Sequence, residues 1–170
     1  MRNCTIRRAR ESDLDRLLEL LAALQKHLEE RNPRVWRESA GDRERARDRL
    51  AKRLSSPKAC VIVAVNDEGT VVGLAVGNIL SQERYLPNAA AYIETAFVEQ
   101  PYRRCGLGSR LVAELCRFFA SHDVEEMSLR YIVGNYEAEQ FWSKLGFEPI
   151  IVTATATRQD VEKMIDRTEG

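Results

Sequence analysis

Apolar residues recur along the chain in two periods, and the longer period predicts the helices. Leucines follow one another at helical spacing over residues 14–28, with Ser12 as the predicted cap and residues 32–33 (Asn-Pro) as the stop. The segment 42–54 is a charged helix with a thin apolar side, and 107–120 is strongly amphipathic. The predicted helices cover residues 13–28, 42–54, 107–120, 136–145 and 158–167.

The shorter period, together with continuous apolar runs, predicts the strands. Residues 59–65 are apolar throughout, as in a strand buried on both faces, and 66–69 (Asn-Asp-Glu-Gly) form a turn into a returning strand. The predicted strands cover residues 4–7, 59–65, 70–80, 89–98, 127–133 and 147–157. This order predicts one α/β domain over residues 1–170, with a mixed, mostly antiparallel central sheet of about six to seven strands flanked by helices. One right-handed crossover follows the antiparallel strands.

Composition narrows the class of protein. The 170 residues carry 26 basic and 26 acidic side chains, so a non-specific nucleic-acid binder is not expected. No apolar run approaches the ~18 residues of a membrane span, and the first residues lack the apolar segment of a secretory signal. The four cysteines form no CxxC pair and the two histidines are far apart, so no metal site is expected. We therefore expect a cytoplasmic protein without membrane or nucleic-acid partners.

The segment most informative about chemistry joins the strand 89–98 to the helix 107–120. It carries two glycines and two arginines, and we call residues 102–108 the glycine loop. Backbone N–H groups at a helix start, with glycines that admit a close anion, suit a phosphate or pyrophosphate. A P-loop would need GxxxxGK[ST], and a dinucleotide fingerprint would need a third glycine where Leu111 stands.

The glycine loop, Tyr-Arg-Arg-Cys-Gly-Leu-Gly, resembles the acetyl-CoA loop of the GNAT N-acetyltransferase superfamily. Residues 135–147 are similar to the family's N-x-x-A-x-x-F-Y-x-x-L-G-F motif, and residues 92–98 to its fourth strand. The resemblance covers residues 59–150 and implies the family's fold, with acetyl-CoA as acetyl donor and an amine as acceptor.

Carried over position by position, the resemblance implies a cofactor site. Backbone groups of the strand end would pair with the pantetheine arm, and backbone amides from Arg104 through Ser109 would hold the pyrophosphate. Asn135 and the start of the helix after it would flank the pantetheine or the thioester end. The cofactor-binding residues so implied are Ala96, Phe97, Val98, Arg103, Arg104, Cys105, Gly106, Leu107, Gly108, Ser109, Asn135, Ala138 and Trp142.

The resemblance also implies a catalytic base, Glu94, which acts directly or through a water molecule. Its alternative is a solvated strand residue. The family often has a tyrosine as general acid where this chain has Trp142, and an indole N–H cannot supply a proton at a useful pKa. Water, Tyr131 or Tyr136 could take that role, or Trp142 only packs, so the general acid is unassigned.

The acceptor is not readable from the sequence. In the family it lies near the first two helices and the loop before the fourth strand, where this chain places Trp36 and Tyr85. The leading hypothesis is an acetyl-CoA-dependent N-acetyltransferase acting on a small amine or a peptide. The alternatives are a non-catalytic acyl-CoA sensor or interaction module and, less well matched, another nucleotide binder. Oligomeric state stays open, with a homodimer through the final strand and helix as one option.

Overall fold

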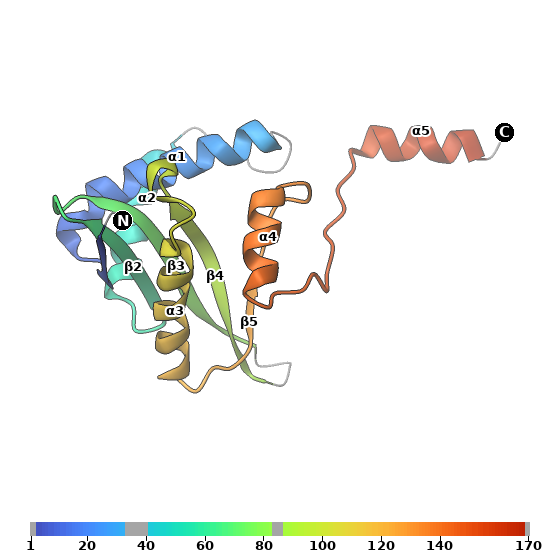
Figure 1. Ribbon diagram of the computed structural model, residues 1–170. Helices are drawn as coiled ribbons and strands as arrows, with labels where there is room; N and C mark the ends of the chain where they lie inside the picture. Colours follow the sequence, from blue (N-terminus) through green and yellow to red (C-terminus); the bar gives the residue numbers. More distant parts are fainter. Residues whose placement is uncertain (1–2, 33–40, 83–86, 169–170) are drawn as a thin grey trace.

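A five-stranded sheet forms the centre of the computed structural model, which describes residues 3–32, 41–82 and 87–168 (Figure 1). The strands are β1 (Cys4–Arg8), β2 (Ala59–Asn66), β3 (Val71–Ser81), β4 (Ala89–Val98) and β5 (Met127–Leu129), adjacent in that order. The first four are antiparallel to their neighbours, and β5 is parallel to β4. A parallel pair needs a crossover, which here contains helix α3 (Leu107–Ala120).

Helices cover both faces of the sheet and create two cores. On one face, α1 (Leu14–Arg31) and α2 (Asp42–Ser55) bury Leu17 and Leu50 against Val63 of β2. On the other face, α3 buries Leu115 and Phe119 against β2, β3 and β4. Because β2 and β3 lie between both layers, their sequences are apolar at nearly every position.

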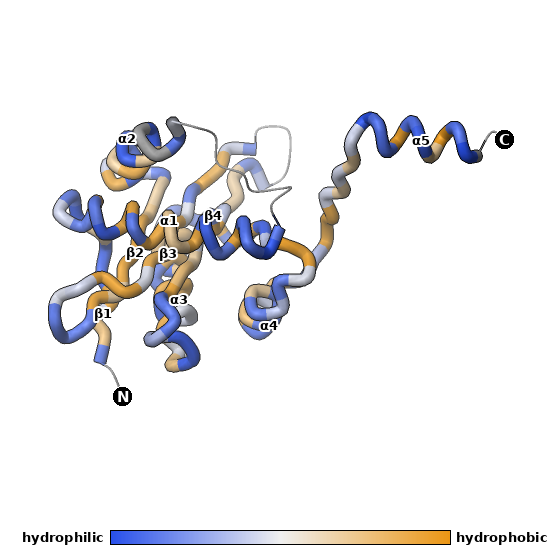
Figure 2. Tube along the Cα trace, turned by 90° about the horizontal axis from the view of Figure 1, so that it is seen from above, coloured by the Kyte–Doolittle hydropathy of each residue, from blue (hydrophilic) through white to orange (hydrophobic). Residues whose placement is uncertain are grey.

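The remaining elements are short or lie at one side of the sheet. The 3-10 helices η1 (Glu11–Asp13) and η2 (Gln100–Tyr102) precede α1 and the glycine loop, respectively. Helix α4 (Tyr136–Lys144) lies beside β5, and α5 (Arg158–Thr168) stands apart from the sheet in two perpendicular views (Figures 1 and 2).

The fold class, the order of the elements and most of their bounds agree with the sequence prediction, but the number of strands is lower. The predicted last strand, residues 147–157, has no regular secondary structure and pairs with no other strand among the described residues. The predicted strand 127–133 is shortened to Met127–Leu129. The residues of 147–157 have the composition of a strand, but a strand forms only where a neighbouring strand exchanges hydrogen bonds with it.

The start of α1 also differs from the prediction. The N-cap position of α1 is Asp13, not Ser12, and the Asp13 side chain makes no capping hydrogen bond to this helix. The Asp13 carboxylate accepts a hydrogen bond from the Arg10 N–H (2.7 Å) and two from the Arg7 guanidinium (2.7 and 2.9 Å). These bonds hold the pKa of Asp13 below its usual range, and the bond from Arg7 is the largest cause. The carboxylate thus joins β1 to the start of α1.

No helix among the described residues is long and apolar enough to cross a membrane.

Candidate functional site

An irregularity in β4 sets the geometry of the candidate site. The pairing of β4 with β3 runs from Ile93↔Gly77 directly to Thr95↔Val76, so Glu94 is an extra residue with no partner on β3. The pairing of β4 with β5 ends at the same place, with Ile93↔Leu129. A β-bulge turns the strand and re-aims its side chains. Beyond Glu94, β4 therefore continues as the edge of the described sheet.

The bulged residue Glu94 points toward α2. Its carboxylate accepts a hydrogen bond from the Arg53 guanidinium (2.7 Å) and another from Asn78 Nδ2 (2.9 Å). The Glu94 side chain is 33% exposed and the Arg53 side chain 30% exposed, so the pair lies at the surface of the α2 layer. The predicted base thus lies on a bent strand, where two side chains orient its carboxylate, and the residue is solvent-exposed, as the alternative interpretation also expects.

The open edge of β4 exposes the backbone groups of alternate residues. The Glu99 N–H bonds to the Val72 carbonyl of β3 (3.0 Å), whereas the Val98 carbonyl accepts from Arg103 Nε (2.8 Å) on the other side. Successive strand residues direct their N–H and C=O groups to opposite neighbours, so Ala96 faces the same way as Val98. Phe97 faces β3, which leaves Ala96 and Val98 as the residues whose backbone an added chain could pair.

The glycine loop reaches the start of α3 through two residues in the left-handed region. Arg104 has φ 62° and the helix-capping Gly106 has φ 78°. A Cβ at Gly106 would meet no heavy atom within 4 Å, so glycine is needed there for its conformation and not for space. The first helical hydrogen bond comes from the Arg110 N–H to the Gly106 carbonyl, so the preceding N–H groups of the first turn, those of residues 107–109, point out of the helix. These N–H groups can donate hydrogen bonds to a bound anion.

Contacts from three directions hold the start of this loop in place. Arg16 of α1 pairs with Glu99 (2.7 Å), and Asn66 Nδ2 donates to the Tyr102 hydroxyl (3.0 Å). The Arg103 guanidinium stacks over the Phe97 ring (5.6 Å to the centroid). Arg103, predicted to supply charge for the cofactor, is therefore used for the structure of the loop, and the exposed Arg104 is the cation that faces solvent.

Helix α4 packs against the same end of α3. A Cβ at Gly108 would lie 3.1 Å from the Phe141 ring, so the absent side chain admits this contact. Asn135 caps α4: its Oδ1 accepts from the Ala138 N–H (3.4 Å), and the residue is 6% exposed. Among the described residues, none accepts a hydrogen bond from Asn135 Nδ2. The structure thus brings the glycine loop, the open edge of β4 and the predicted residues of α4 together.

Trp142 is a core residue. It is 7% exposed, and its ring lies edge-on to Phe141 (4.8 Å) and Phe147 (5.4 Å). This packing agrees with the alternative that Trp142 has no proton role. Of the two tyrosines considered as general acid, Tyr136 is 71% exposed and Tyr131 packs against the α3 core. Trp36 and Tyr85, the predicted acceptor residues, lie outside the described residues.

Sequence reasoning missed the residues that orient Glu94 and the loop, namely Arg53, Asn78, Arg16 and Asn66. Each stands far in sequence from the residue that it contacts and belongs to no motif. The only available signal was the polar Asn78 within an otherwise apolar strand.

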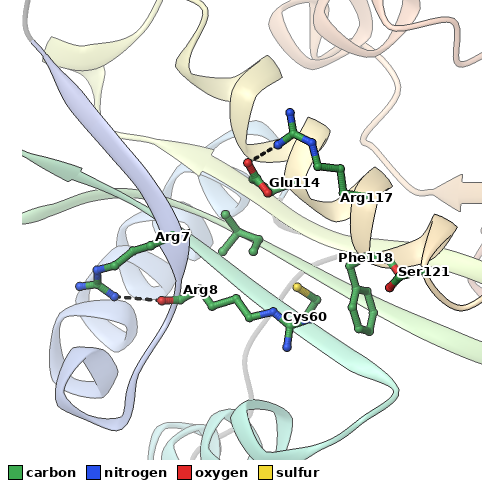
Figure 3. Close-up of a pocket in the computed structure, with 8 residues that line it drawn as sticks. Arg7, Arg8, Cys60, Glu114, Arg117, Phe118 and Ser121 are labelled. Atoms are coloured by element: carbon green, nitrogen blue, oxygen red, sulfur yellow. Dashed lines mark hydrogen bonds and ion pairs between the residues drawn. The ribbon is translucent and has the colours of Figure 1, made fainter.

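A hollow of about 240 Å³ lies elsewhere, between β1, β2 and the second half of α3 (Figure 3). Its charged groups are already engaged: Arg117 pairs with Glu114, Arg7 donates to the Arg8 carbonyl, and Arg8 stacks over Phe118. Arg117 is ten residues from the start of α3, or about 15 Å along the helix, so the hollow is separate from the glycine loop. Burial raises the pKa of the Cys60 thiol in its wall. No group of three His, Cys, Asp or Glu side chains in the described ranges could hold a metal.

Comparisons with known proteins bear on the family and the fold of the chain. A model of the Acetyltransferase (GNAT) family matches residues 21–147. No curated protein sequence matches the chain.

Solved structures share the fold at low sequence identity. A tetramutant of the BH1408 protein from Bacillus halodurans has a TM-score of 0.78 and 19% identity, covering 90% of this chain and 99% of its own. Aminoglycoside 6'-N-acetyltransferase AAC(6')-Ih from Acinetobacter baumannii has a TM-score of 0.72 and 16% identity, covering 92% and 98%. Aminoglycoside N-acetyltransferase AAC(6')-Iy in complex with CoA has a TM-score of 0.71 and 20% identity, covering 93% and 97%. With three quarters of its length matched by the family model, the chain belongs to the GNAT acetyltransferase family.

Proposed function

We propose that this protein transfers the acetyl group of acetyl-CoA to a primary amine of a small molecule or a peptide, by direct attack in a ternary complex. The observation that carries the proposal is the open edge of β4, which runs about 13 Å from the bulge at Glu94 to Val98 and the glycine loop. One end of this edge has outward backbone amides for an anion, and the other end has a carboxylate.

The residues present fit a CoA thioester. The amides of residues 107–109 and the exposed Arg104 would hold the pyrophosphate, and the backbone of Ala96 and Val98 would pair with the extended pantetheine arm. Val98 can accept from the arm only if Arg103 Nε shares or leaves its carbonyl. Asn135 Nδ2 and the first turn of α4 would flank the thioester end.

Acetyl-CoA, when bound, supplies an activated acetyl group whose leaving group is a thiolate. Glu94 would accept one proton from the substrate ammonium, so that the neutral nitrogen can bond to the carbonyl carbon. As the C–S bond breaks, the second proton of that nitrogen would pass to the departing thiolate or to water. Backbone N–H groups on the open edge would donate to the carbonyl oxygen as it gains negative charge. The general acid for the thiolate stays unassigned. With a thiol pKa near ~8.5, releasing the thiolate at pH 7 is uphill by only about 2 kcal/mol, so none is obligatory.

The Arg53–Glu94 pair bears on the acceptor. A substrate ammonium must compete with Arg53 for the Glu94 carboxylate, while Asn78 continues to orient the second oxygen. Because the Glu94 carboxylate already pairs with one cation, it can pair with a cationic acceptor that takes the place of Arg53.

The test is turnover of acetyl-CoA with a panel of polyamines, α-amino peptides and aminoglycosides, the last because two structural neighbours carry that activity in their names. Release of CoA is followed by chromatography, since the exposed Cys105 would react with a thiol dye. Acetylated product with one class supports the proposal and identifies the acceptor class. If CoA raises the melting temperature no more than ATP or NAD does, the proposed cofactor site is wrong.

A second candidate is a non-catalytic acyl-CoA sensor. The burial of Trp142, where the family often has tyrosine, and the existing ion pair of Glu94 favour it. A melting shift with CoA, combined with no product from any amine of the panel, would support this function over transfer.

A further inference from the structure

Helix α2 carries a row of charged side chains that ends beside Glu94. Spacings of three and four residues place on one side of this helix Asp42, Arg45, Arg49 and Arg53, which we call the α2 row. Arg49 pairs with Asp42 (2.7 Å), and Arg53 at the end of the row pairs with Glu94 of β4. The row has three cations and one carboxylate of its own, so Glu94 supplies the second negative charge beside it.

The Arg53 guanidinium contacts both oxygens of the Glu94 carboxylate. Its Nη2 lies 2.7 Å from Oε1 and 2.5 Å from Oε2. Both side chains are about one third exposed, so an incoming molecule can reach the pair. Within the residues that the structure describes, Glu94 is the one acidic side chain that forms an ion pair with Arg53. A group that takes over the Glu94 carboxylate therefore leaves Arg53 without a counter-charge.

The proposed acetyl transfer requires the acceptor to take over this carboxylate. The substrate ammonium would bind Glu94 and then give it a proton, which removes the negative charge that holds Arg53. Two cations close to one carboxylate also repel each other. After the exchange, the α2 row would hold three cations against the carboxylate of Asp42. An acceptor that brings its own anion avoids this imbalance, because the anion can pair with Arg53 while the ammonium pairs with Glu94.

We propose that the acceptor is a small amine with a carboxylate close to its amino group, as in an amino acid, and that Arg53 exchanges Glu94 for this carboxylate. Arg53 is then a specificity-determining residue for the reaction. A guanidinium suits this role because its planar set of N–H donors matches the geometry of a carboxylate. Asn78 keeps its bond to Glu94 (2.9 Å) during the exchange, so the base stays oriented. This inference rests on the proposed function and narrows its acceptor class.

The test compares amino acids with their own C-terminal amides as acceptors, with the full chain and acetyl-CoA. The panel includes small, acidic, basic and aromatic side chains. An amide keeps the amine and the side chain of its amino acid but lacks the carboxylate. We measure kcat/KM for both members of each pair and compare the acid-to-amide ratio between enzymes, because the different reactivities of the two amines then cancel.

The native protein should acetylate the acid member of at least one pair, and Arg53→Gln should lower the acid-to-amide ratio of that pair at least about tenfold. Most of this loss should be a higher KM for the acid, because the carboxylate contact exists in the ground state as well as in the transition state. Arg53→Lys keeps the charge without the planar donors, so its ratio should lie between those of the native protein and Arg53→Gln.

Arg47→Gln is the matched control. Arg47 lies on the same helix, but its side chain is 53% exposed and pairs with Asp15 of α1. The substitution removes one ion pair of α2 without touching Glu94, and it should leave the acid-to-amide ratio unchanged.

The outcomes separate this inference from the proposed function. If Arg53 only orients Glu94, Arg53→Gln lowers kcat/KM for acids and amides equally, which would overturn the inference and leave acetyl transfer in place. A native protein that acetylates polyamines or aminoglycosides but no amino acid would overturn it in the same way. If no amine of either kind yields an acetylated product, the proposed function is wrong and the inference falls with it.

Discussion

The role of Glu94 can be tested by its dependence on the acceptor amine. At pH 7 a lysine-like amine, with pKa ~10.4, is neutral in only about one molecule in 2,500, a deficit of about 4.6 kcal/mol. An α-amino group with pKa ~7.7–8.0 lacks only about 1–1.4 kcal/mol. A base that removes the ammonium proton is therefore worth much more to the first amine.

Glu94→Gln keeps the size of the side chain and its hydrogen bonding to Asn78, but it cannot take a proton. The lost ion pair with Arg53 is partly exposed and contributes on the order of 0.2–1 kcal/mol, too little to unfold the domain. We expect kcat/KM for a lysine-like amine to fall about 10²–10⁴-fold, and the loss for an α-amine to be at least about tenfold smaller.

Glu99→Gln is the matched control. Glu99 lies just beyond the other end of β4, its side chain is 31% exposed, and it pairs with an arginine, Arg16. Its substitution should lower stability to a similar extent and leave the ratio of the two amines unchanged. Steady-state kinetics with both amines measure that ratio. Equal losses for the two amines in Glu94→Gln, or no loss, would exclude Glu94 as the base.

Three further predictions follow from local geometry. Gly106→Ala should weaken CoA binding, which a smaller CoA-induced rise in melting temperature would show. Gly69→Ala is the matched control, because Gly69 has nearly the same φ in a distant turn. Each variant should lower the free energy of unfolding by about 1 kcal/mol, but Gly69→Ala should leave CoA binding unchanged. Asp13→Asn should lower the free energy of unfolding, measured in urea at pH 7, by about 1.5–3 kcal/mol. Arg7 lowers the pKa of Asp13 in the folded state, so the wild-type protein should have its full advantage in stability above about pH 4. This advantage should disappear as the pH falls through the lowered pKa. Cys105 is exposed in the glycine loop, so its thiol should be the first to be alkylated, and bound CoA should slow that reaction. Peptide mass spectrometry measures the rate of alkylation. If saturating CoA does not protect Cys105, the proposed contact between CoA and the loop is wrong.

Much of the fold could be predicted because it depends on local patterns. The predicted bounds of α3 are the observed ones, since its apolar residues recur at helical spacing and Gly106 precedes it. The hairpin of β2 and β3 follows from two apolar runs and a turn, in which the Asn66 side chain accepts from the N–H groups of Glu68 and Thr70. These signals lie within a few residues of what they determine.

The last strand could not be predicted because its existence depends on a partner. Residues 147–157 have the composition of a strand, but the sequence alone does not show which strand edge they would pair with. The segment 147–157 is thus one place where local propensity and the observed structure disagree.

The position of Glu94 could not be derived from alternation either. With a period of two, Ala91, Ile93 and Thr95 would share one face, yet the structure places Ala91, Ile93, Ala96 and Val98 on the α3 side. The bulge shifts the pattern by one residue, and a shift of one residue moves every later side chain to the other face. Only the family motif, not the hydrophobic pattern, indicated that this position carries chemistry.

The bulge also explains why the features of the site occur together. At Glu94 the strand gains a residue without a partner, turns that side chain toward Arg53 on α2, and leaves its pairing with β5. In a regular β4, Glu94 would pair with a residue of β3 within the ladder, and its side chain would keep the alternation of the strand. One inserted residue therefore opens the edge and orients the carboxylate beside it. For this reason we expect deletion of Glu94, unlike Glu94→Gln, to abolish CoA binding as well as turnover, which a melting-shift assay with CoA can measure.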